Sequence, residues 1–187
     1  MAPKYLYRFF TFLILGWLFV SAGFSTMAQI TAVPGISSSQ KLGHSVILSG
    51  TANTKHFFWI EDSSAGIRNI YYKRAVNQTW QNQKILLHNY TGSLTDSIHG
   101  INCITLPSGK ILAAFRTDNH YLIYSDDAGN NWSQPHILPT GVTGLQRRLA
   151  LQGQLSYDAA GNLFYTYVRS GISYFIKSTD GGITWQQ

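Results

Sequence analysis

From residue 41 onward, short apolar or aromatic runs alternate with clusters of Gly, Asn, Asp and Ser. Runs of this length, bounded by turn-forming residues, are typical of β-strands. The segments 107–109 and 158–161 predict hairpin turns, and no amphipathic helix is visible in this region. The pattern predicts strands at 41–48, 55–61, 69–74 and 80–87; at 101–106, 110–116, 121–125 and 132–138; and at 151–157, 162–169 and 172–178.

One short pattern, S-x-D-x-G-x-x-W, occurs twice, each time directly after an aromatic strand-like run. An Asp and a Gly between two strands predict a turn, because the carboxylate accepts nearby backbone N–H groups and the Gly supplies a positive φ. We expect the Trp to open the next strand and to pack under the hairpin. The two copies are Ser125, Asp127, Gly129 and Trp132, and Ser178, Asp180, Gly182 and Trp185.

A third, degenerate copy precedes these two. Ala75 stands in the place of the Asp, Asn77 stands in the place of the Gly, and Trp80 keeps the Trp. Asn at the Gly position is compatible with a turn, because it tolerates the left-handed conformation. The three Trp residues recur at a spacing of roughly 50 residues, which is the period of a four-stranded propeller blade.

The repeated pattern resembles the Asp box of sialidases (neuraminidases) and of other proteins with BNR repeats. The resemblance covers residues 41–187 and implies an all-β fold, a β-propeller of four-stranded antiparallel blades of which about three are present. Three blades do not close a ring, so the sequence reads as the N-terminal part of a longer protein that needs further blades. A truncated, non-functional product and a self-assembling half-propeller are the alternatives.

The N-terminus has the order of features found in a secretory signal peptide. Lys4 and Arg8 precede an unbroken apolar run at 9–20, and residues 26–28, Thr-Met-Ala, fit a cleavage site. The run is too short to favour a spanning helix, although an uncleaved anchor is the alternative. We therefore predict a signal peptide at 1–28, a linker at 29–40, an extracellular or periplasmic location and no membrane span after cleavage.

Composition excludes several classes of function. Charged residues make up 12% of the chain and aromatic residues 14%, and the formal net charge of +6 is spread without a long Lys/Arg cluster. This distribution is not typical of a nucleic-acid-binding protein. Cys103, the single cysteine, lies in an apolar run and is expected to be a buried hydrophobic residue. The histidines show no metal-ligand spacing, and we expect neither a metal nor a cofactor.

The predicted strand layout separates two sets of polar residues. The Asp-box positions fall in third-to-fourth turns, where we expect a structural role. Five of the six arginines outside the predicted signal peptide fall on or beside the opposite face, together with Glu61, Asp62, His99 and His120. These arginines are Arg68, Arg116 and Arg169 in second-to-third connections, and Arg147 and Arg148 between the second and third blades.

The resemblance assigns roles to part of this face. Sialidases hold the carboxylate of sialic acid with three arginines, use a Tyr nucleophile and use an Asp as acid/base. It implies a glycan substrate, Arg116 as the leading carboxylate-binding candidate and Asp96 or Asp118 as the proton donor. The Arg-Ile-Pro segment of sialidases is missing here. Two alternatives stay open: a non-catalytic glycan-binding or interaction propeller, and a solvated Arg116 paired with Asp118.

Overall fold

The computed structural model describes residues 41–50, 53–62, 67–81, 83–90, 100–117, 119–142 and 153–187. All of them belong to one structural unit, Pro34–Gln187. The predicted signal peptide at 1–28, the linker at 29–40, and the residues Asp96, Asp118, Arg147 and Arg148 lie outside the described residues.

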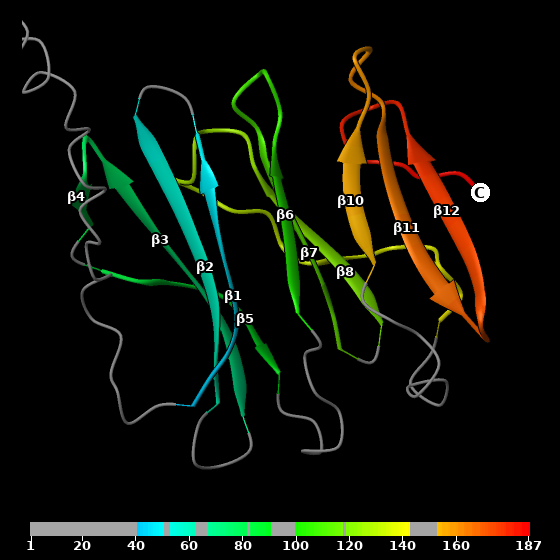
Figure 1. The fold of residues 1–187 in the computed structure, drawn as a ribbon, viewed down its shortest axis with the longest axis horizontal. Coiled ribbons are helices and arrows are strands. Elements are labelled where there is room, and N and C mark those ends of the chain that lie inside the picture. Colours follow the sequence, from blue (N-terminus) through cyan, green and yellow to red (C-terminus); the bar gives the residue numbers. More distant parts are fainter. Residues whose placement is uncertain are drawn as a thin grey trace, which may run out of the picture. The chain divides into compact units, whose positions relative to one another are not determined.

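The described residues form three antiparallel sheets and no helix, as expected for an all-β protein (Figure 1). Neighbouring strands in each sheet follow one another along the chain, except that β5 pairs with β3, so pairing is local. Sheet A contains β1 (Lys41–Ser49), β2 (Thr54–Asp62), β3 (Arg68–Val76), β4 (Thr79–Trp80) and β5 (Ile85–Tyr90). Sheet B contains β6 (Ile101–Thr105), β7 (Ile111–Arg116), β8 (His120–Ser125) and β9 (His136–Ile137), and sheet C contains β10 (Gln154–Tyr157), β11 (Leu163–Arg169) and β12 (Ile172–Ser178).

Sheet B is packed on both faces, because alternate side chains of a strand point to opposite sides. In β7 every residue is buried. Ile111, Ala113 and Phe115 belong to a core shared with sheet A, which contributes residues such as Phe58 and Tyr72. The intervening side chains face the other way, into a second core that sheets B and C share. That core contains Leu112, Ala114 and Leu122 from sheet B, and Leu155, Leu163, Tyr165, Tyr167 and Ile176 from sheet C.

The prediction for Cys103 is confirmed. Its side chain is buried in the core between sheets A and B, and burial raises the pKa of its thiol well above the ordinary value. A thiol of this kind is a poor nucleophile.

The fourth strand of the first sheet differs from the prediction of one strand at 80–87. Asn77 and Gln78, with φ values of 48° and 68°, form a tight turn that places Trp80 opposite Ala75. The chain then leaves the sheet and returns as β5, which pairs with the other half of β3. This copy of the pattern has no Asp to organise a wider loop, so Asn77 and Gln78 close the hairpin in the left-handed conformation. The predicted fourth strand is therefore present as two separate strands, β4 and β5.

The other Trp positions also differ from the expectation that Trp opens a strand. Trp132 precedes β9 by several residues, and β9 is shorter than the predicted strand 132–138. Trp185 directly precedes Gln186, which forms an isolated antiparallel bridge with Lys177 of β12. Both Trp side chains pack into the sheet cores, so the prediction that they lie under the hairpins fits the packing.

Candidate functional site

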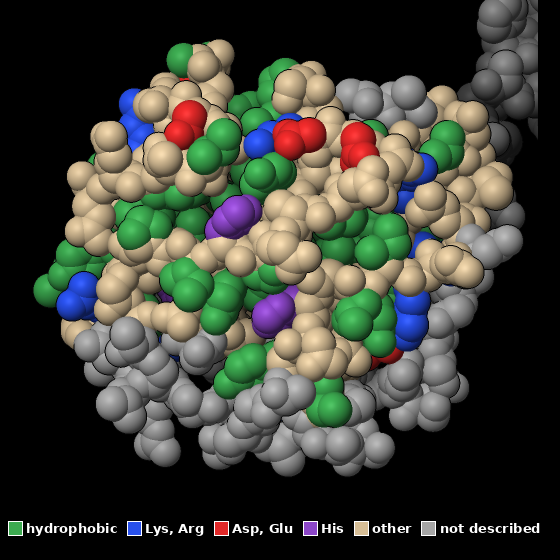
Figure 2. Space-filling model, turned by 180° about the vertical axis from the view of Figure 1, so that it is seen from behind, with side chains coloured by type: hydrophobic (Ala, Val, Ile, Leu, Met, Phe, Trp, Pro, Cys, Tyr) green, Lys and Arg blue, Asp and Glu red, His purple; other side chains and the backbone are tan. Residues whose placement is uncertain are grey.

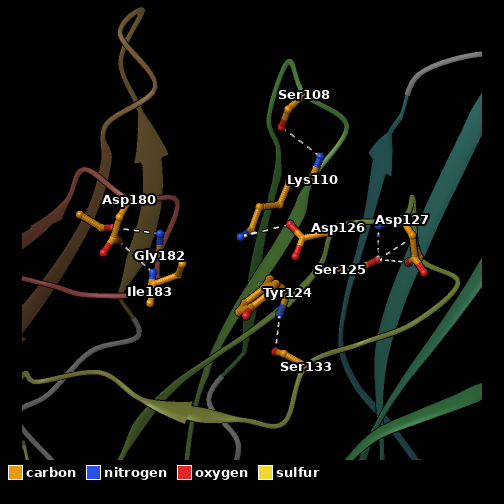
Figure 3. Close-up of polar contacts among 12 residues, drawn as sticks. Ser108, Lys110, Tyr124, Ser125, Asp126, Asp127, Ser133, Asp180, Gly182 and Ile183 are labelled. Carbon is orange, nitrogen blue, oxygen red and sulfur yellow. Dashed lines mark hydrogen bonds and ion pairs between the residues drawn. The ribbon is translucent and has the colours of Figure 1, made fainter.

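The first copy of the pattern, residues 125–132, forms a turn held by one carboxylate (Figure 3). Ser125 Oγ donates to Asp127 Oδ1 at 2.8 Å and accepts the backbone N–H of Gly129 at 2.8 Å. Asp127 Oδ1 also accepts the backbone N–H groups of Asn130 and Asn131, at 3.1 and 2.8 Å. The Asn131 side chain donates to Asp127 Oδ2 at 2.6 Å. We call this segment the first motif turn.

The second copy, residues 178–185, repeats this geometry and is called the second motif turn. Ser178 Oγ donates to Asp180 Oδ1 at 2.8 Å and accepts the N–H of Gly182 at 2.9 Å. Asp180 accepts the N–H groups of Ile183 and Thr184, and the Thr184 hydroxyl donates to Asp180 Oδ2 at 2.6 Å. The predicted bonding of both Asp side chains to turn amides is therefore confirmed, and in each carboxylate both oxygens accept hydrogen bonds from their own turn.

These hydrogen bonds favour the ionised carboxylates. The N–H and side-chain amide of Asn131, followed by Ser125, lower the pKa of Asp127 to about 2. Bonds from Thr184 lower the pKa of Asp180 further below its ordinary value. A group with a depressed native pKa contributes stability above its unfolded pKa. That contribution is lost as the pH falls through the native pKa.

We expect Asp127→Ala to lower the thermal unfolding midpoint at pH 7, because several turn N–H groups lose their acceptor. Asp126→Ala is the matched control, since Asp126 is 66% exposed and makes a surface ion pair with Lys110 at 3.2 Å. The difference between the two variants should shrink as the pH falls from about 4 through about 2. Thermal melts that show equal losses for Asp126→Ala and Asp127→Ala would contradict the structural role.

Each motif turn also rests against the preceding sheet. A Cβ atom on Gly129 would lie 1.9 Å from Tyr72 Oη of β3, and Arg74 Nη1 donates to the carbonyl of Ala128 at 2.9 Å. In the second motif turn, a Cβ atom on Gly182 would lie 3.2 Å from Leu112 and from Leu122 of sheet B. The Gly of the pattern therefore supplies both the positive φ and the space for a side chain of the neighbouring sheet.

Arginines and turn carboxylates occupy opposite ends of the strands. Arg68 begins β3, Arg116 ends β7 and Arg169 ends β11, so all three flank second-to-third connections, as the strand layout predicted. Asp126, Asp127, Asp158 and Asp180 lie in turns at the other end of their sheets. Figure 2 shows most of the acidic side chains of one face along its upper edge. The arginine ends carry the candidate chemistry.

Arg116 is the most deeply placed of these arginines. Its side chain has 0% exposure and lies on the face of sheet B that packs against sheet C. Burial lowers the pKa of its guanidinium, and the nearby Tyr165 opposes that shift. Arg116 pairs across the hairpin with His120, whose ring contacts the rings of Tyr165 and Tyr167 edge-on. The alternative of a solvated Arg116 therefore does not hold for the described side chain, whereas Asp118 lies outside the described residues.

His120 and Tyr165 belong to this cluster, although the sequence singled out neither as a partner of Arg116. Burial, with a smaller effect of Arg116, lowers the pKa of His120 to about 4, so the ring is neutral at pH 7. Burial also raises the pKa of Tyr165. The hairpin register of residues 116 and 120 could have been anticipated from the strand pattern, whereas the contact with β11 depends on sheet packing.

The other predicted site residues are not brought together by the described part of the chain. Arg68 and Arg169 are half-buried and belong to sheets A and C, on either side of sheet B. Glu61 is occupied within sheet A, where it accepts from Trp59 Nε1 at 2.8 Å and from Lys84 Nζ at 2.7 Å. Asp96, Asp118, Arg147 and Arg148, which lie outside the described residues, remain predictions.

The described residues contain no group of three or more His, Cys, Asp or Glu side chains that could hold a metal ion. They also contain no helix of the length and apolarity that a membrane span requires.

Comparison with known proteins gives matches in structure only. Neither a family model nor a curated protein sequence matches the chain. A protein of unknown function from Dyadobacter fermentans superposes with a TM-score of 0.58 at 12% identity, covering 80% of this chain and 54% of that one. The Hadza microbial sialidase Hz136 superposes with a TM-score of 0.53 at 13% identity, covering 83% of this chain and 35% of that one.

The described part of the chain has a sialidase-like β fold. The chain spans about half the length of the first matched structure and about a third of the second. At this level of identity the likeness concerns the fold alone, because one fold supports many functions.

Proposed function

We propose that the chain is part of a secreted sialidase-like protein that acts on terminal sialic acids of glycoconjugates, with its sheets arranged as propeller blades. The contacts of β6 with both β1 and β10 support the blade arrangement, because the first strands of successive sheets then lie next to one another. Such a protein needs further blades, which would supply the Tyr nucleophile and the remaining carboxylate-binding arginines that the resemblance implies.

The observation that carries this proposal is Arg116, a buried guanidinium at the arginine end of the central sheet. A guanidinium binds a carboxylate through two parallel hydrogen bonds, and such a pair is stronger away from water. Arg68 and Arg169 lie beside the second-to-third connections of the flanking sheets, as Arg116 does in sheet B. Three arginines at the same end of the sheets support an anionic ligand there. Asp96 or Asp118 would act as proton donor.

A non-catalytic glycan-binding or interaction propeller is the second candidate. The complete burial of Arg116, which pairs across the hairpin with His120 and lies near Tyr165 of sheet C, favours it, because a side chain enclosed between two sheets fits a structural role. Glu61, an acidic residue at the arginine end of sheet A, is likewise used in a structural contact.

Arg116→Ala in the full-length protein separates the two candidates. For the enzyme, we expect binding or turnover of sialyllactose to fall about ten- to a hundredfold, the loss of one charge-assisted carboxylate contact, with lactose unaffected. Arg116→Lys should restore little, because an ammonium does not form the bidentate contact.

Arg74→Ala is the control, since Arg74 lies at the motif-turn end and binds the Ala128 carbonyl. It should lower the unfolding temperature without changing the preference for sialyllactose over lactose. Calorimetric titration that finds both sugars equally affected by Arg116→Ala, or neither bound, would overturn the proposal. A lowered unfolding temperature as the sole effect would favour the structural candidate.

A further inference from the structure

A buried histidine lies beneath the first motif turn, away from the arginine end. His56 of β2 is 1% exposed, and its Nδ1 lies 2.7 Å from Tyr72 Oη of β3, so the two share a hydrogen bond. The two rings stack with centroids 5.9 Å apart. Because Tyr72 is itself fully buried, neither group can exchange its partner for water without a structural change.

Tyr72 connects this pair to the turn. Its Oη lies against Gly129, closely enough that a Cβ atom there would overlap it. Its ring also contacts the ring of Trp132 edge-on, with the ring centroids 4.8 Å apart, at the far end of the same turn. Arg74, two residues further along β3, binds the Ala128 carbonyl. The turn of sheet B thus rests on three contacts with two side chains of sheet A.

The charged and titratable groups around His56 are Tyr72 and Arg74 of β3, and Asp127 of the turn, which acts on Tyr72. Burial, followed by the positive charge of Arg74, lowers the pKa of His56 from 6.5 to about 4. Burial dominates at Tyr72 and raises its pKa. The hydrogen bond is therefore made by a neutral imidazole and a neutral phenol at pH 7.

We propose that this contact is an acid-sensitive latch, in which protonation of His56 releases the first motif turn from sheet A. A neutral imidazole can accept a hydrogen bond from the tyrosine hydroxyl. An imidazolium carries hydrogens on both nitrogens and can only donate hydrogen bonds. Tyr72 must then turn its own hydroxyl proton towards Gly129, and a second positive charge is buried beside Arg74. Both changes act on the surface that seats the turn.

The sign of the effect follows from linkage. The native pKa of His56 is below its ordinary value, so the latch is fully closed above about pH 6.5 and opens as the pH falls through about 4. Asp127 does not open it in this range, because its pKa lies near 2. The two titrations are therefore separated along the pH axis.

Nuclear magnetic resonance of the full-length protein tests the proposal. The His56 ring protons report its protonation, and the Gly129 amide and Trp132 indole signals report the seating of the turn. In the unmodified chain, all three should shift together with a midpoint near pH 4. In His56→Gln, which stays neutral, the Gly129 and Trp132 signals should not move until the pH is about one unit lower or more.

Tyr72→Phe keeps the ring and removes the hydroxyl, and it serves if His56→Gln fails to fold. There, His56 should still titrate while the Gly129 signal no longer follows it. His136→Gln is the control, because His136 is exposed and stacks on Tyr124, so it should leave the midpoint unchanged. A Gly129 transition that persists in His56→Gln, or that follows His56 in Tyr72→Phe, would overturn the proposal.

Discussion

Gly129→Ala should destabilise the protein by about 3 kcal/mol or more, through overpacking combined with a strained backbone. The added methyl group would lie 1.9 Å from Tyr72 Oη, inside a fully buried contact between sheets A and B. The backbone at Gly129 also has a φ of 86°, which Ala adopts only with strain. Denaturant titration monitored by tryptophan fluorescence measures the loss.

Gly109→Ala provides an unusually close control. Gly109 has a φ of 87°, but no atom lies within 4 Å of the position where its Cβ would be. It should therefore show the backbone cost alone, about 1–2 kcal/mol. The difference between the two variants isolates the contact with Tyr72, and Tyr72→Phe should partly restore Gly129→Ala. Equal losses at both positions would show that the turn is not seated on sheet A.

The second large effect is expected at His120, between sheets B and C. Its pKa of about 4, against an ordinary 6.5, means that the neutral ring contributes stability above about pH 6.5 that is lost as the pH falls through 4. Lowering the pH from 7 to 4 should therefore cost about 3 kcal/mol through this residue. His120 has 0% exposure, so solvent does little to reduce the effect.

His120→Phe keeps a ring against Tyr165 and Tyr167 and removes the titrating group. We expect this variant to lose less stability than the unmodified chain between pH 7 and pH 4 in denaturant titrations. Replacing the exposed His136 by Gln should leave the pH dependence unchanged. An unaltered pH profile in His120→Phe would mean that His120 is not protonated on unfolding in this range.

The sequence predicts the turns and most strands because these depend on neighbouring residues. The hydrogen bonds of Asp127 and Asp180 join residues no more than four positions apart, so the pattern carries almost all of the information needed. The prediction of one strand at 80–87 was wrong because the local pattern there is incomplete. The pattern around Trp80 had lost its Asp, and the conformation of Asn77 and Gln78 then decided where pairing began.

The candidate site could be predicted only in part. The strand order correctly places Arg68, Arg116 and Arg169 at second-to-third connections. It does not reveal that Arg116 is buried, because the face of sheet B that carries Arg116 packs against sheet C, whose residues, such as the nearby Tyr165, are distant in sequence. Likewise, nothing in the residues around His56 indicates that Gly129 would rest on its partner Tyr72, since that contact joins two sheets.

The burial of β7 on both faces has a consequence for how the protein unfolds. Because strand pairing within each sheet is local, a single sheet can separate from its neighbours without breaking its own hairpins. Loss of sheet C would uncover Leu112, Ala114 and Leu122 on an otherwise intact sheet B. A partly unfolded species with such an apolar sheet surface self-associates, so thermal denaturation of this protein should become less reversible as its concentration rises.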